Sequence, residues 1–319
     1  MTRTERSDSQ TRRAAPGARV PVSVIIPTRN EERNLRQTLS SVIHWADQVI
    51  VFDSFSDDRT VEIARELQAH VIQRRFNNFA AHKNWALDNL PLGNEWVLFL
   101  DADERLTREL SEEIGGLLHR EDCCDGYYVA RKNYFMGRWI RHAGMYPDWQ
   151  LRLFRRHLGR YEERLVHEHV LLNGRVGYLK NPVEHIDFKG LERWFDRHNL
   201  YTSFEAIEIF RLRQNLGGAR IRSRFFLRGP ERTRLIKELA YRYAPCRSPL
   251  VFFWMYVVRG GFLDGRMGFR YCLLKAFVDY QTILKVLEIE SDPSSPILER
   301  HRAMQSAAFS KRADSCSQD

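Results

Sequence analysis

The chain of 319 residues is long enough to bury a sizeable core, and its apolar content of 43% excludes a wholly disordered protein. A formal net charge of +9 predicts attraction to an anionic partner, and charge alone does not choose among nucleic acid, an anionic bilayer and phosphorylated ligands. The five cysteines form no CxxC pair, which argues against a disulfide framework or a zinc knuckle and for a reducing compartment.

The first half of the chain alternates strands and helices. Residues 1–19 are polar and lack the apolar segment of a signal peptide, so a disordered tail is expected. Strands are then expected at 22–26, 48–52, 71–72 and 95–100, and helices at 34–43, 60–67 and 81–90. Continuous apolar strands separated by helices of about ten residues predict a mostly parallel sheet covered on both faces. The predicted fold class is therefore α/β.

The second half has a different pattern. A helix is expected at 107–118 and a strand at 126–130, followed by aromatic, basic and irregular sequence up to residue 186. Residues 191–290 have a helical pattern, and the stretch 211–247 holds eleven Lys and Arg against two acidic residues. These changes predict a domain at 20–190, a basic helical extension at 191–290 and a disordered tail at 291–319. The longest apolar run has nine residues, whereas a membrane-spanning helix needs about 20, so no transmembrane segment is expected.

Polar residues follow three of the predicted strands at the point where each ends. They are residues 28–31, 53–58 and 101–104. Ligands bind beyond the carboxyl ends of the strands in open parallel sheets, so these groups are expected to meet at one edge. Clustered carboxylates repel one another unless a cation or hydrogen-bond donors lie between them. For any one strand, an Asp that caps the following helix is the alternative.

The pattern at the last strand end favours a metal. Neither a GxGxxG motif after the first strand nor a GxxxxGK[ST] motif is present, so the glycines of a dinucleotide site or a P-loop are missing. Phosphates would then be neutralised by a cation. Asp101 and Asp103, two positions apart at a strand exit, suit Mg²⁺ or Mn²⁺, which take oxygen ligands and share them with substrate phosphates.

Three segments carry a family resemblance. They are VSVIIPTRNEE at 22–32, VFDSFSDDRT at 51–60 and FLDADE at 99–104. In their order and spacing the chain resembles glycosyltransferase family 2, and more narrowly the lipopolysaccharide-core β-1,4-glucosyltransferase group. A modest departure is Phe55, where that group usually has a small residue. The resemblance implies a GT-A fold, an inverting mechanism and a UDP-sugar donor.

The resemblance also assigns roles at the nucleotide site. Asp53 would contact the uracil or the ribose, Asp101 the ribose side of the nucleotide or the metal, and Asp103 would ligate the metal that bridges the diphosphate. The end of the first strand would line the nucleotide pocket with Pro27, Thr28, Arg29, Asn30 and Glu31. Lys83 and Asn84 are candidate neighbours of the nucleotide or its phosphates, and an exposed polar helix start is the alternative.

An inverting transfer also needs a base for the acceptor hydroxyl. The candidate is Asp148 in the segment YPDWQLRLFR at 146–155, where Pro147 replaces the Glu common in the family; a Pro-Asp turn is the alternative. Arg152 in the same segment is expected to face a phosphate or the acceptor, or else to lie on a solvated strand face.

Four further residues complete the sequence predictions for the site. In the segment HEH at 167–169 only His167 and His169 could share a site, since adjacent residues of a strand point to opposite faces, and the resemblance makes His167 a candidate third metal ligand. Glu168 is the alternative base. His185 and His198 are expected to be structural or surface residues.

The apolar pattern at 269–287 has two interpretations. The helix either packs in the core or lies in a membrane interface, with Trp254 and Tyr256 near the headgroups and arginines drawing it to an anionic surface. The second interpretation predicts a peripheral protein on the cytoplasmic face of the cell membrane, with a lipopolysaccharide-core, lipid-linked or polysaccharide acceptor. The rivals are a metal-dependent nucleotidyltransferase and a basic nucleic-acid-binding protein. The sequence has no helix-turn-helix or zinc-finger pattern, so no nucleic-acid partner is expected.

Overall fold

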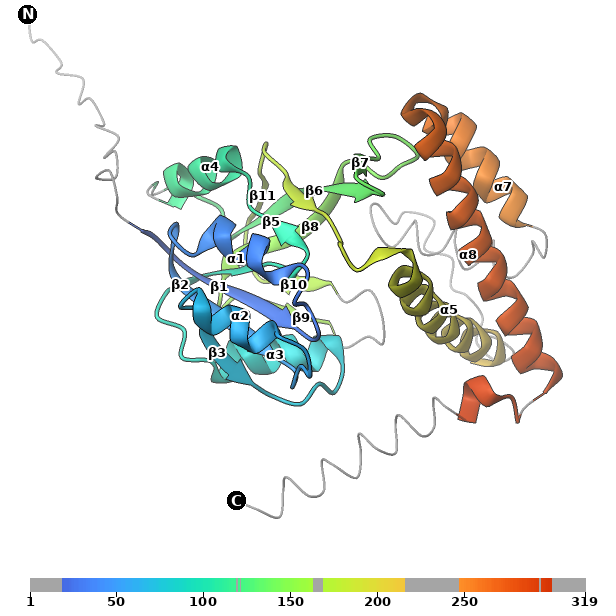
Figure 1. Ribbon diagram of the computed structural model, residues 1–319, viewed down its shortest axis with the longest axis horizontal. Coiled ribbons are helices and arrows are strands. Elements are labelled where there is room, and N and C mark those ends of the chain that lie inside the picture. Colours follow the sequence, from blue (N-terminus) through green and yellow to red (C-terminus); the bar gives the residue numbers. More distant parts are fainter. Residues whose placement is uncertain are drawn as a thin grey trace, which may run out of the picture.

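A curved sheet forms the centre of the protein, and long helices lie at one end of it (Figure 1). The computed structural model describes residues 19–118, 120, 122–162, 169–215, 247–292 and 294–299. Several predictions fall wholly or largely outside these residues: the two tails, most of the basic stretch 211–247, His167 and Glu168.

The first half of the sheet is parallel. Its strands are β1 (Val20–Thr28), β2 (Ala46–Asp53), β3 (His70–Gln73) and β4 (Trp96–Phe99), in the order β3-β2-β1-β4. Between them run α1 (Leu35–Val42), α2 (Thr60–Glu66) and α3 (Phe79–Asn89). Each expected element is present within a few residues of its predicted bounds.

Apolar residues on both faces of these strands explain the layered arrangement. Val24 and Ile26 of β1 belong to a cluster that includes Leu39 of α1. The intervening Ile25 belongs to a second cluster that includes Ala86 of α3. Because successive residues of a strand point to opposite faces, β1 is buried on both sides, as the continuous apolar run predicts. The α/β class is confirmed.

The second half of the sheet is mixed. It contains β5 (Glu104–Arg105), β6 (Gly126–Phe135), β7 (Arg138–Trp139), β8 (Asp148–Arg155), β11 (Val176–Tyr178) and β12 (Val183–His185), and α4 (Arg108–Leu118) follows β5. Strand β8 joins the two halves, because it runs antiparallel to both β4 and β6. A separate antiparallel pair is formed by β9 (Gly159–Tyr161) and β10 (Val170–Leu172).

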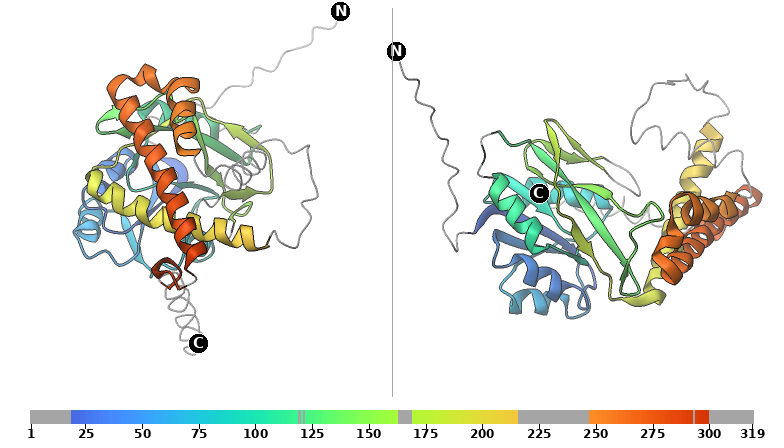
Figure 2. Two further views of the ribbon diagram at one scale, coloured as in Figure 1. Left: turned by 90° about the vertical axis from the view of Figure 1, so that its right-hand side faces the viewer. Right: turned by 90° about the horizontal axis from the view of Figure 1, so that it is seen from above.

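The C-terminal elements are helical. They are α5 (Gly190–Asn215), α7 (Arg247–Phe253), the π-helix η1 (Trp254–Val258), the 3-10 helix η2 (Gly261–Asp264) and α8 (Gly265–Ser291). Helix α5 packs on α8 through Ile207 and Ile209 against Val286 and Ile289, and α7 and α8 lie on the outer side, away from the sheet (Figure 2). Among the described residues, no helix combines the length and the apolar character that crossing a bilayer requires.

The loop between β7 and β8 is attached to the C-terminal helices. The backbone N–H of His142 donates to Oδ2 of Asp264, and the His142 ring is 2.8 Å from Oδ1 of the same carboxylate. Tyr271 of α8 packs with Phe135 and Ile140 in a small apolar cluster. The strand that begins with Asp148 is therefore preceded by a loop that η2 and α8 hold in place.

Candidate active site

The polar strand ends lie along one edge of the sheet, as expected. In the parallel register Thr28 is paired with Asp53, and Asp53 is paired in turn with Gln73 of β3. On the other side of β1, Ile25 is paired with Phe99, which places Asp101 just beyond the same edge. A site is therefore built here from residues that are remote in sequence.

Asp53 is buried at this edge, and both of its carboxylate oxygens accept hydrogen bonds. Its Oδ1 accepts hydrogen bonds from the hydroxyls of Thr28 and Ser56, at 3.0 and 2.5 Å. Its Oδ2 accepts from the Ser56 backbone N–H and the Gln73 amide, at 3.0 and 2.9 Å. Burial alone would raise the pKa of Asp53, but the hydrogen bonds from Ser56, Gln73 and Thr28 outweigh it and lower the pKa. In this arrangement the carboxylate organises the loops, and a contact with uracil or ribose stays a prediction.

The loops after β1 and β2 are bound to each other. Asn30 donates its backbone N–H to Ser56, and its side-chain oxygen accepts from the backbone of Asp57. Glu31 donates its backbone N–H to Thr60, while its carboxylate is 2.5 Å from the Lys189 ammonium. These side chains therefore fix loop positions in this structure. Pro27 lies within β1, paired with Phe52 of β2.

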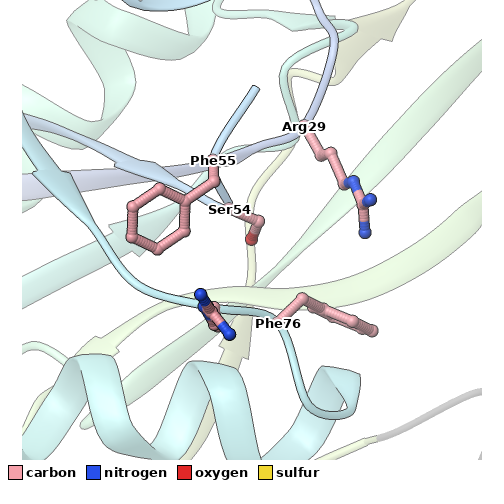
Figure 3. A pocket seen from close by; sticks show the side chains of 5 residues that line it. Arg29, Ser54, Phe55 and Phe76 are labelled. Carbon is pink, nitrogen blue, oxygen red and sulfur yellow. The ribbon is translucent and has the colours of Figure 1, made fainter. Parts of the chain in front are cut away.

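A pocket of about 370 Å³ opens beyond the ends of β1, β2 and β3. It is lined by Arg29, Ser54, Phe55, Arg75 and Phe76. Figure 3 shows Phe55 and Arg29 on either side of Ser54, with Phe76 across from them. Two exposed aromatic rings offer stacking surfaces, and two guanidinium groups offer hydrogen-bond donors for anionic oxygens. The pocket therefore suits a planar ring that carries phosphate. Of the five residues predicted at the end of β1, Arg29 lines it.

Phe55 is held in an unusual backbone conformation at the rim of this pocket. Its φ is +57°, in the left-handed region that large side chains rarely adopt, and its ring is half exposed. A small residue, and glycine above all, would adopt this conformation with less strain. Here the neighbouring hydrogen bonds of Ser56 to Asp53 and Asn30 hold the turn.

His82 of α3 lies next to Ser54, which lines the pocket, and its surroundings favour one protonation state of the ring. Its Nδ1 is 3.1 Å from the Arg74 guanidinium, and its Nε2 is 3.3 Å from the Ser54 hydroxyl. Since arginine only donates, Nδ1 must accept, and the ring proton therefore lies on Nε2 and points to Ser54. Burial and the charges of Arg74 and Lys83 lower the pKa of His82 to about 4. The ring is thus neutral near pH 7.

Asp101 belongs to a charged network at the end of β4. One guanidinium nitrogen of Arg152 donates both to Asp101, at 2.5 Å, and to Glu104, at 2.7 Å. Burial by itself raises the pKa of Asp101, but Arg152, Lys83 and Arg131 lower it well below the ordinary value. Glu104 is completely buried, and burial raises its pKa in spite of Arg152. Arg152 is thus buried among carboxylates, and the alternative of a solvated strand face is wrong.

Asp103 faces a histidine from a distant strand. Its Oδ2 is 3.2 Å from Nε2 of His185, the last residue of β12, and 3.9 Å from Arg197 of α5. Burial would raise the pKa of Asp103, but His185 and Arg197 lower it, so the group is ionised near neutral pH. The expectation that His185 was a structural or surface residue missed this juxtaposition. Its ring is largely buried and aimed at the predicted metal ligand.

Asp103 and His185 fit a divalent cation. Neighbouring ligands around an octahedral metal lie about 3 Å apart when the bonds are about 2.1 Å, close to the spacing of Oδ2 and Nε2. Carboxylate and imidazole are both accepted by Mn²⁺. In the part of the chain that the structure describes, no three His, Cys, Asp or Glu side chains form a complete metal cage. Remaining ligands would have to come from Asp101, from residues outside that part such as His167, or from a phosphate.

Asp148, the candidate base, begins β8. Its Oδ2 accepts two hydrogen bonds from Arg131, at 2.9 and 2.7 Å, and Oδ1 accepts from Gln150. Burial would raise the pKa of Asp148, but Arg131 lowers it and keeps the group ionised. Arg131 is also 3.7 Å from Glu104. Alternating charges therefore connect Asp148 with Asp101 through Arg131, Glu104 and Arg152.

Lys83 and Asn84, on α3, have different surroundings. The Lys83 ammonium lies 4.9 Å from the Tyr161 ring centroid and is close enough to Asp101 to lower its pKa. The Asn84 amide both donates to and accepts from the backbone of Tyr161, at 2.9 and 2.8 Å. Lys83 is thus placed beside the acidic site, whereas Asn84 joins α3 to β9. Direct contacts of both with a nucleotide stay predictions.

With this geometry in view, comparison with known proteins decides the family. Residues 23–186, just over half of the chain, match glycosyl transferase family 2. The chain belongs to glycosyl transferase family 2. It is a transferase, and its parallel half with the acidic strand ends corresponds to the GT-A arrangement expected from the sequence.

The chain is also similar to individual proteins and solved structures. An uncharacterized glycosyltransferase of Rickettsia typhi is 29% identical over 201 residues, which cover 59% of this chain and 68% of that protein. The lipopolysaccharide core biosynthesis glycosyltransferase LpsC of Rhizobium meliloti is 29% identical over 195 residues, 59% of this chain and 71% of LpsC. Among solved structures, a mannosyltransferase of Pyrobaculum calidifontis in complex with GDP-Man and Mn²⁺ is 15% identical, covers 85% of this chain and 88% of that chain, and has a TM-score of 0.49.

Three residues of this candidate site were not singled out from the sequence, namely Arg75, Phe76 and Arg131, and a fourth, His185, was expected to be a structural or surface residue. Arg75 and Phe76 follow β3, whose short strand gave a weak signal. Arg131 meets Asp148 through the antiparallel register of β6 and β8. The signal that could have found His185 is its place at the end of a short apolar run, since a strand end at the rim is where ligands bind.

Proposed function

We propose that this glycosyltransferase moves a hexose from a UDP-sugar, with inversion at the sugar, to a lipopolysaccharide-core, lipid-linked or polysaccharide acceptor. One observation carries the proposal: the pair Asp103 and His185 lies on the same sheet edge as the aromatic, arginine-lined pocket. A nucleotide base and a metal-bound diphosphate can then be held side by side.

The nucleotide base of the donor would lie in the pocket, and its diphosphate would extend towards Asp103. Phe55 and Phe76 would stack on or flank the base, and Arg29 and Arg75 would donate to the ribose or phosphate oxygens. Lys83, which is near enough to Asp101 to lower its pKa, would contact the diphosphate. Asp101 is held by Arg152 with one oxygen, Oδ2, which leaves Oδ1 for a ribose hydroxyl or the metal.

The divalent metal would be Mn²⁺ or Mg²⁺, held by Asp103 and His185. Once bound, it would offset the negative charge that the diphosphate gains as it leaves. The protein's own part is to keep Asp103 ionised, which Arg197 promotes, and to orient His185 at the end of β12. His167 stays a candidate for a further ligand.

Asp148 would take the proton of the acceptor hydroxyl. Arg131 keeps its carboxylate ionised near neutral pH and fixes its orientation with two hydrogen bonds. An inverting reaction needs this base on the face of the sugar opposite the diphosphate. Glu168 is the alternative, and substitution of each carboxylate in turn separates the two.

The acceptor and the setting are part of the same proposal. Similarity to LpsC supports an acceptor of the lipopolysaccharide core. We place the enzyme on the cytoplasmic face of the membrane as a peripheral protein. The chain would be divided near residue 190, where α5 begins, into a catalytic domain and a helical extension.

A thermal-shift screen tests the donor. UDP-, GDP- and dTDP-sugars are compared with and without Mn²⁺, because a ligand of the folded state raises Tm by mass action. A Mn²⁺-dependent shift with UDP-sugars is expected, and a shift with another nucleotide alone would refute the UDP assignment. Product analysis separates glycosyl transfer, which releases UDP, from nucleotidyl transfer, which releases pyrophosphate.

A further inference from the structure

One face of α8 exposes a stripe of large apolar side chains. Its six residues lie three or four positions apart and are 43% to 53% exposed: Phe269, Leu273, Phe277, Tyr280, Leu284 and Leu287. The opposite face of α8 packs on α5 and the sheet side through other residues, among them Tyr271, Val286 and Ile289. Core packing of the helix therefore does not account for the stripe, and that interpretation of the pattern at 269–287 is wrong for these six residues.

The preceding elements extend this apolar surface. Large side chains that are 49% to 65% exposed follow one another along α7, η1 and η2: Leu250, Phe253, Trp254, Phe262 and Leu263. Helices α7 and α8 lie side by side on the outer side of the protein (Figure 2). We call these five residues and the α8 stripe the outer apolar surface. Soluble monomers rarely expose so many large apolar residues together unless they bind something there.

Positive charge accompanies the apolar residues. Residues 250–287, which span the outer apolar surface, contain five Lys and Arg and two acidic residues: Asp264, whose carboxylate is bound by His142, and Asp279, which is paired with Arg247. A pocket of about 360 Å³ in this region is lined by Tyr256, Gly265, Arg266, Phe269 and Arg270. Guanidinium groups bind phosphate, and aromatic rings favour the boundary between apolar and aqueous phases.

From this juxtaposition we infer that the outer apolar surface docks the enzyme on an anionic phospholipid bilayer, with Arg266 and Arg270 binding lipid phosphates. The inference rests on the proposed function for its biological setting. A second copy of the chain is disfavoured as the occupant, because a two-fold contact through this surface would bring the arginine-rich patches of the two copies together. Apolar residues flanked by basic ones are the expected pattern for a protein that lies in a membrane interface.

The docking surface is directly connected to the acceptor side of the active site. The loop before Asp148 is bound to η1 and η2 by two contacts: Ala143 donates its N–H to the carbonyl of Arg259, and His142 is bound to Asp264. The Tyr271 hydroxyl of α8 is 3.3 Å from Sδ of Met145 in the same loop. An acceptor anchored in the bilayer would thus approach the side of the enzyme where the proposed base lies.

Vesicle flotation of the full chain tests the inference. Vesicles of phosphatidylcholine alone are compared with vesicles that also contain phosphatidylglycerol, and the bound fraction is measured. We expect binding to be roughly tenfold or more stronger with phosphatidylglycerol and to weaken as salt is added. If the chain stays in solution with both vesicle types, the inference is overturned.

Two double variants separate the apolar and the electrostatic contributions. Leu250→Ser with Leu263→Ser should lower vesicle binding roughly tenfold, because both side chains are more than 60% exposed and would insert into the interface. The matched control is Leu171→Ser with Val176→Ser, two exposed apolar residues on other elements, which should bind as the original chain does.

The second variant, Arg266→Gln with Arg270→Gln, should remove most of the preference for phosphatidylglycerol. Its control is Arg65→Gln with Arg193→Gln, which removes the same charge from exposed positions of α2 and α5. Unchanged binding in both docking variants would overturn the inference. The inference would also be overturned if the original chain self-associated and Leu273→Ser made it monomeric without any loss of vesicle binding.

The Mn²⁺-dependent Tm shift with UDP is measured for every variant. It should be unchanged, since the substituted residues lie outside the donor pocket and Asp103. This readout also shows that each variant is folded. A docking variant that loses vesicle binding but keeps the UDP-dependent Tm shift tests docking alone. If the original chain binds vesicles but gives no Tm shift with UDP, the proposed donor is contradicted and the docking inference still stands.

Discussion

Nε2 of His185 lies 3.2 Å from Oδ2 of Asp103, although β12 and the end of β4 are far apart in sequence. The contact exists because β12 pairs with β6 on one side and with β5, directly after Asp103, on the other. The short strand β12 thus places the imidazole of His185 at the edge where the parallel strands end. This pair is the core of the proposed metal site.

The pair makes the first prediction. Asp103→Ala or His185→Ala should each reduce metal-promoted activity about 100-fold or more, because the cation would lose a protein ligand. Isothermal titration of UDP with and without Mn²⁺ should show that the metal no longer strengthens UDP binding. Chelation by EDTA should affect the original chain in the same way. His157→Ala, at an exposed position, serves as the control, and unchanged activity in the Asp103 variant would remove the metal assignment.

Asp148→Asn should show whether Asp148 acts as the base or as a ligand of the donor. The amide keeps the shape of the side chain but cannot accept the acceptor proton, so kcat should fall about 10²-fold to 10⁴-fold. The Kd for UDP should stay within error of the original, because Asp148 is proposed to act on the acceptor and not on the donor. Asp88→Asn, an exposed residue paired with Arg160, is the matched control. If UDP binding weakened instead, Asp148 would be a donor ligand.

The buried neutral His82 predicts a loss of stability in mild acid. Its pKa is lowered to about 4 in the folded protein by burial and by Arg74 and Lys83, while the ordinary value is 6.5. Between these values the unfolded chain binds a proton that the folded chain does not, so the free energy of unfolding decreases as the pH falls through this window. The contribution is at most about 3 kcal/mol.

Urea unfolding across that pH range measures this effect. His82→Gln cannot take up a proton and should give a shallower dependence of stability on pH. Some dependence should remain, because burial also lowers the pKa of His198 to about 4. Identical pH profiles for the variant and the original chain would contradict the role given to His82.

Phe55→Gly should raise the stability of the protein and weaken its binding of the nucleotide. Glycine adopts the left-handed conformation without strain, so about 1 kcal/mol of stability is expected. UDP should bind severalfold less tightly, because a stacking surface of the pocket is lost. Met136→Gly is a close control: Met136 also has positive φ and the same exposed fraction of 53%, but it lies in the turn between β6 and β7. It should gain stability with no change in UDP affinity.

The parallel half could be predicted from the sequence because its signals are local. Strands β1, β2 and β4 each contain a buried apolar run, and polar residues follow each of these strands. Parallel pairing then forces Thr28, Asp53 and Asp101 to one edge, whatever the rest of the chain does. The position of Asp103 was predictable for the same reason.

The remaining site depends on pairings between distant strands, which local patterns do not encode. The Arg131 partner of Asp148 follows from the register of β6 against β8, and the His185 partner of Asp103 follows from the place of β12. The helix pattern at 269–287 predicted α8 but not its orientation. Its exposed face is decided by where α5 packs, and the helical periodicity is the same for either choice.

Arginine has a particular part in the charge network. One nitrogen of Arg152 serves two carboxylates, while Arg131 spans from Asp148 to Glu104 with different edges of its planar group. At position 131 a lysine, which carries its charge on a single nitrogen, could not reach two acids from different edges. A saturation library at position 131 should therefore return arginine almost exclusively among active clones, and the site would diversify around its acids more readily than around the cation that spans them.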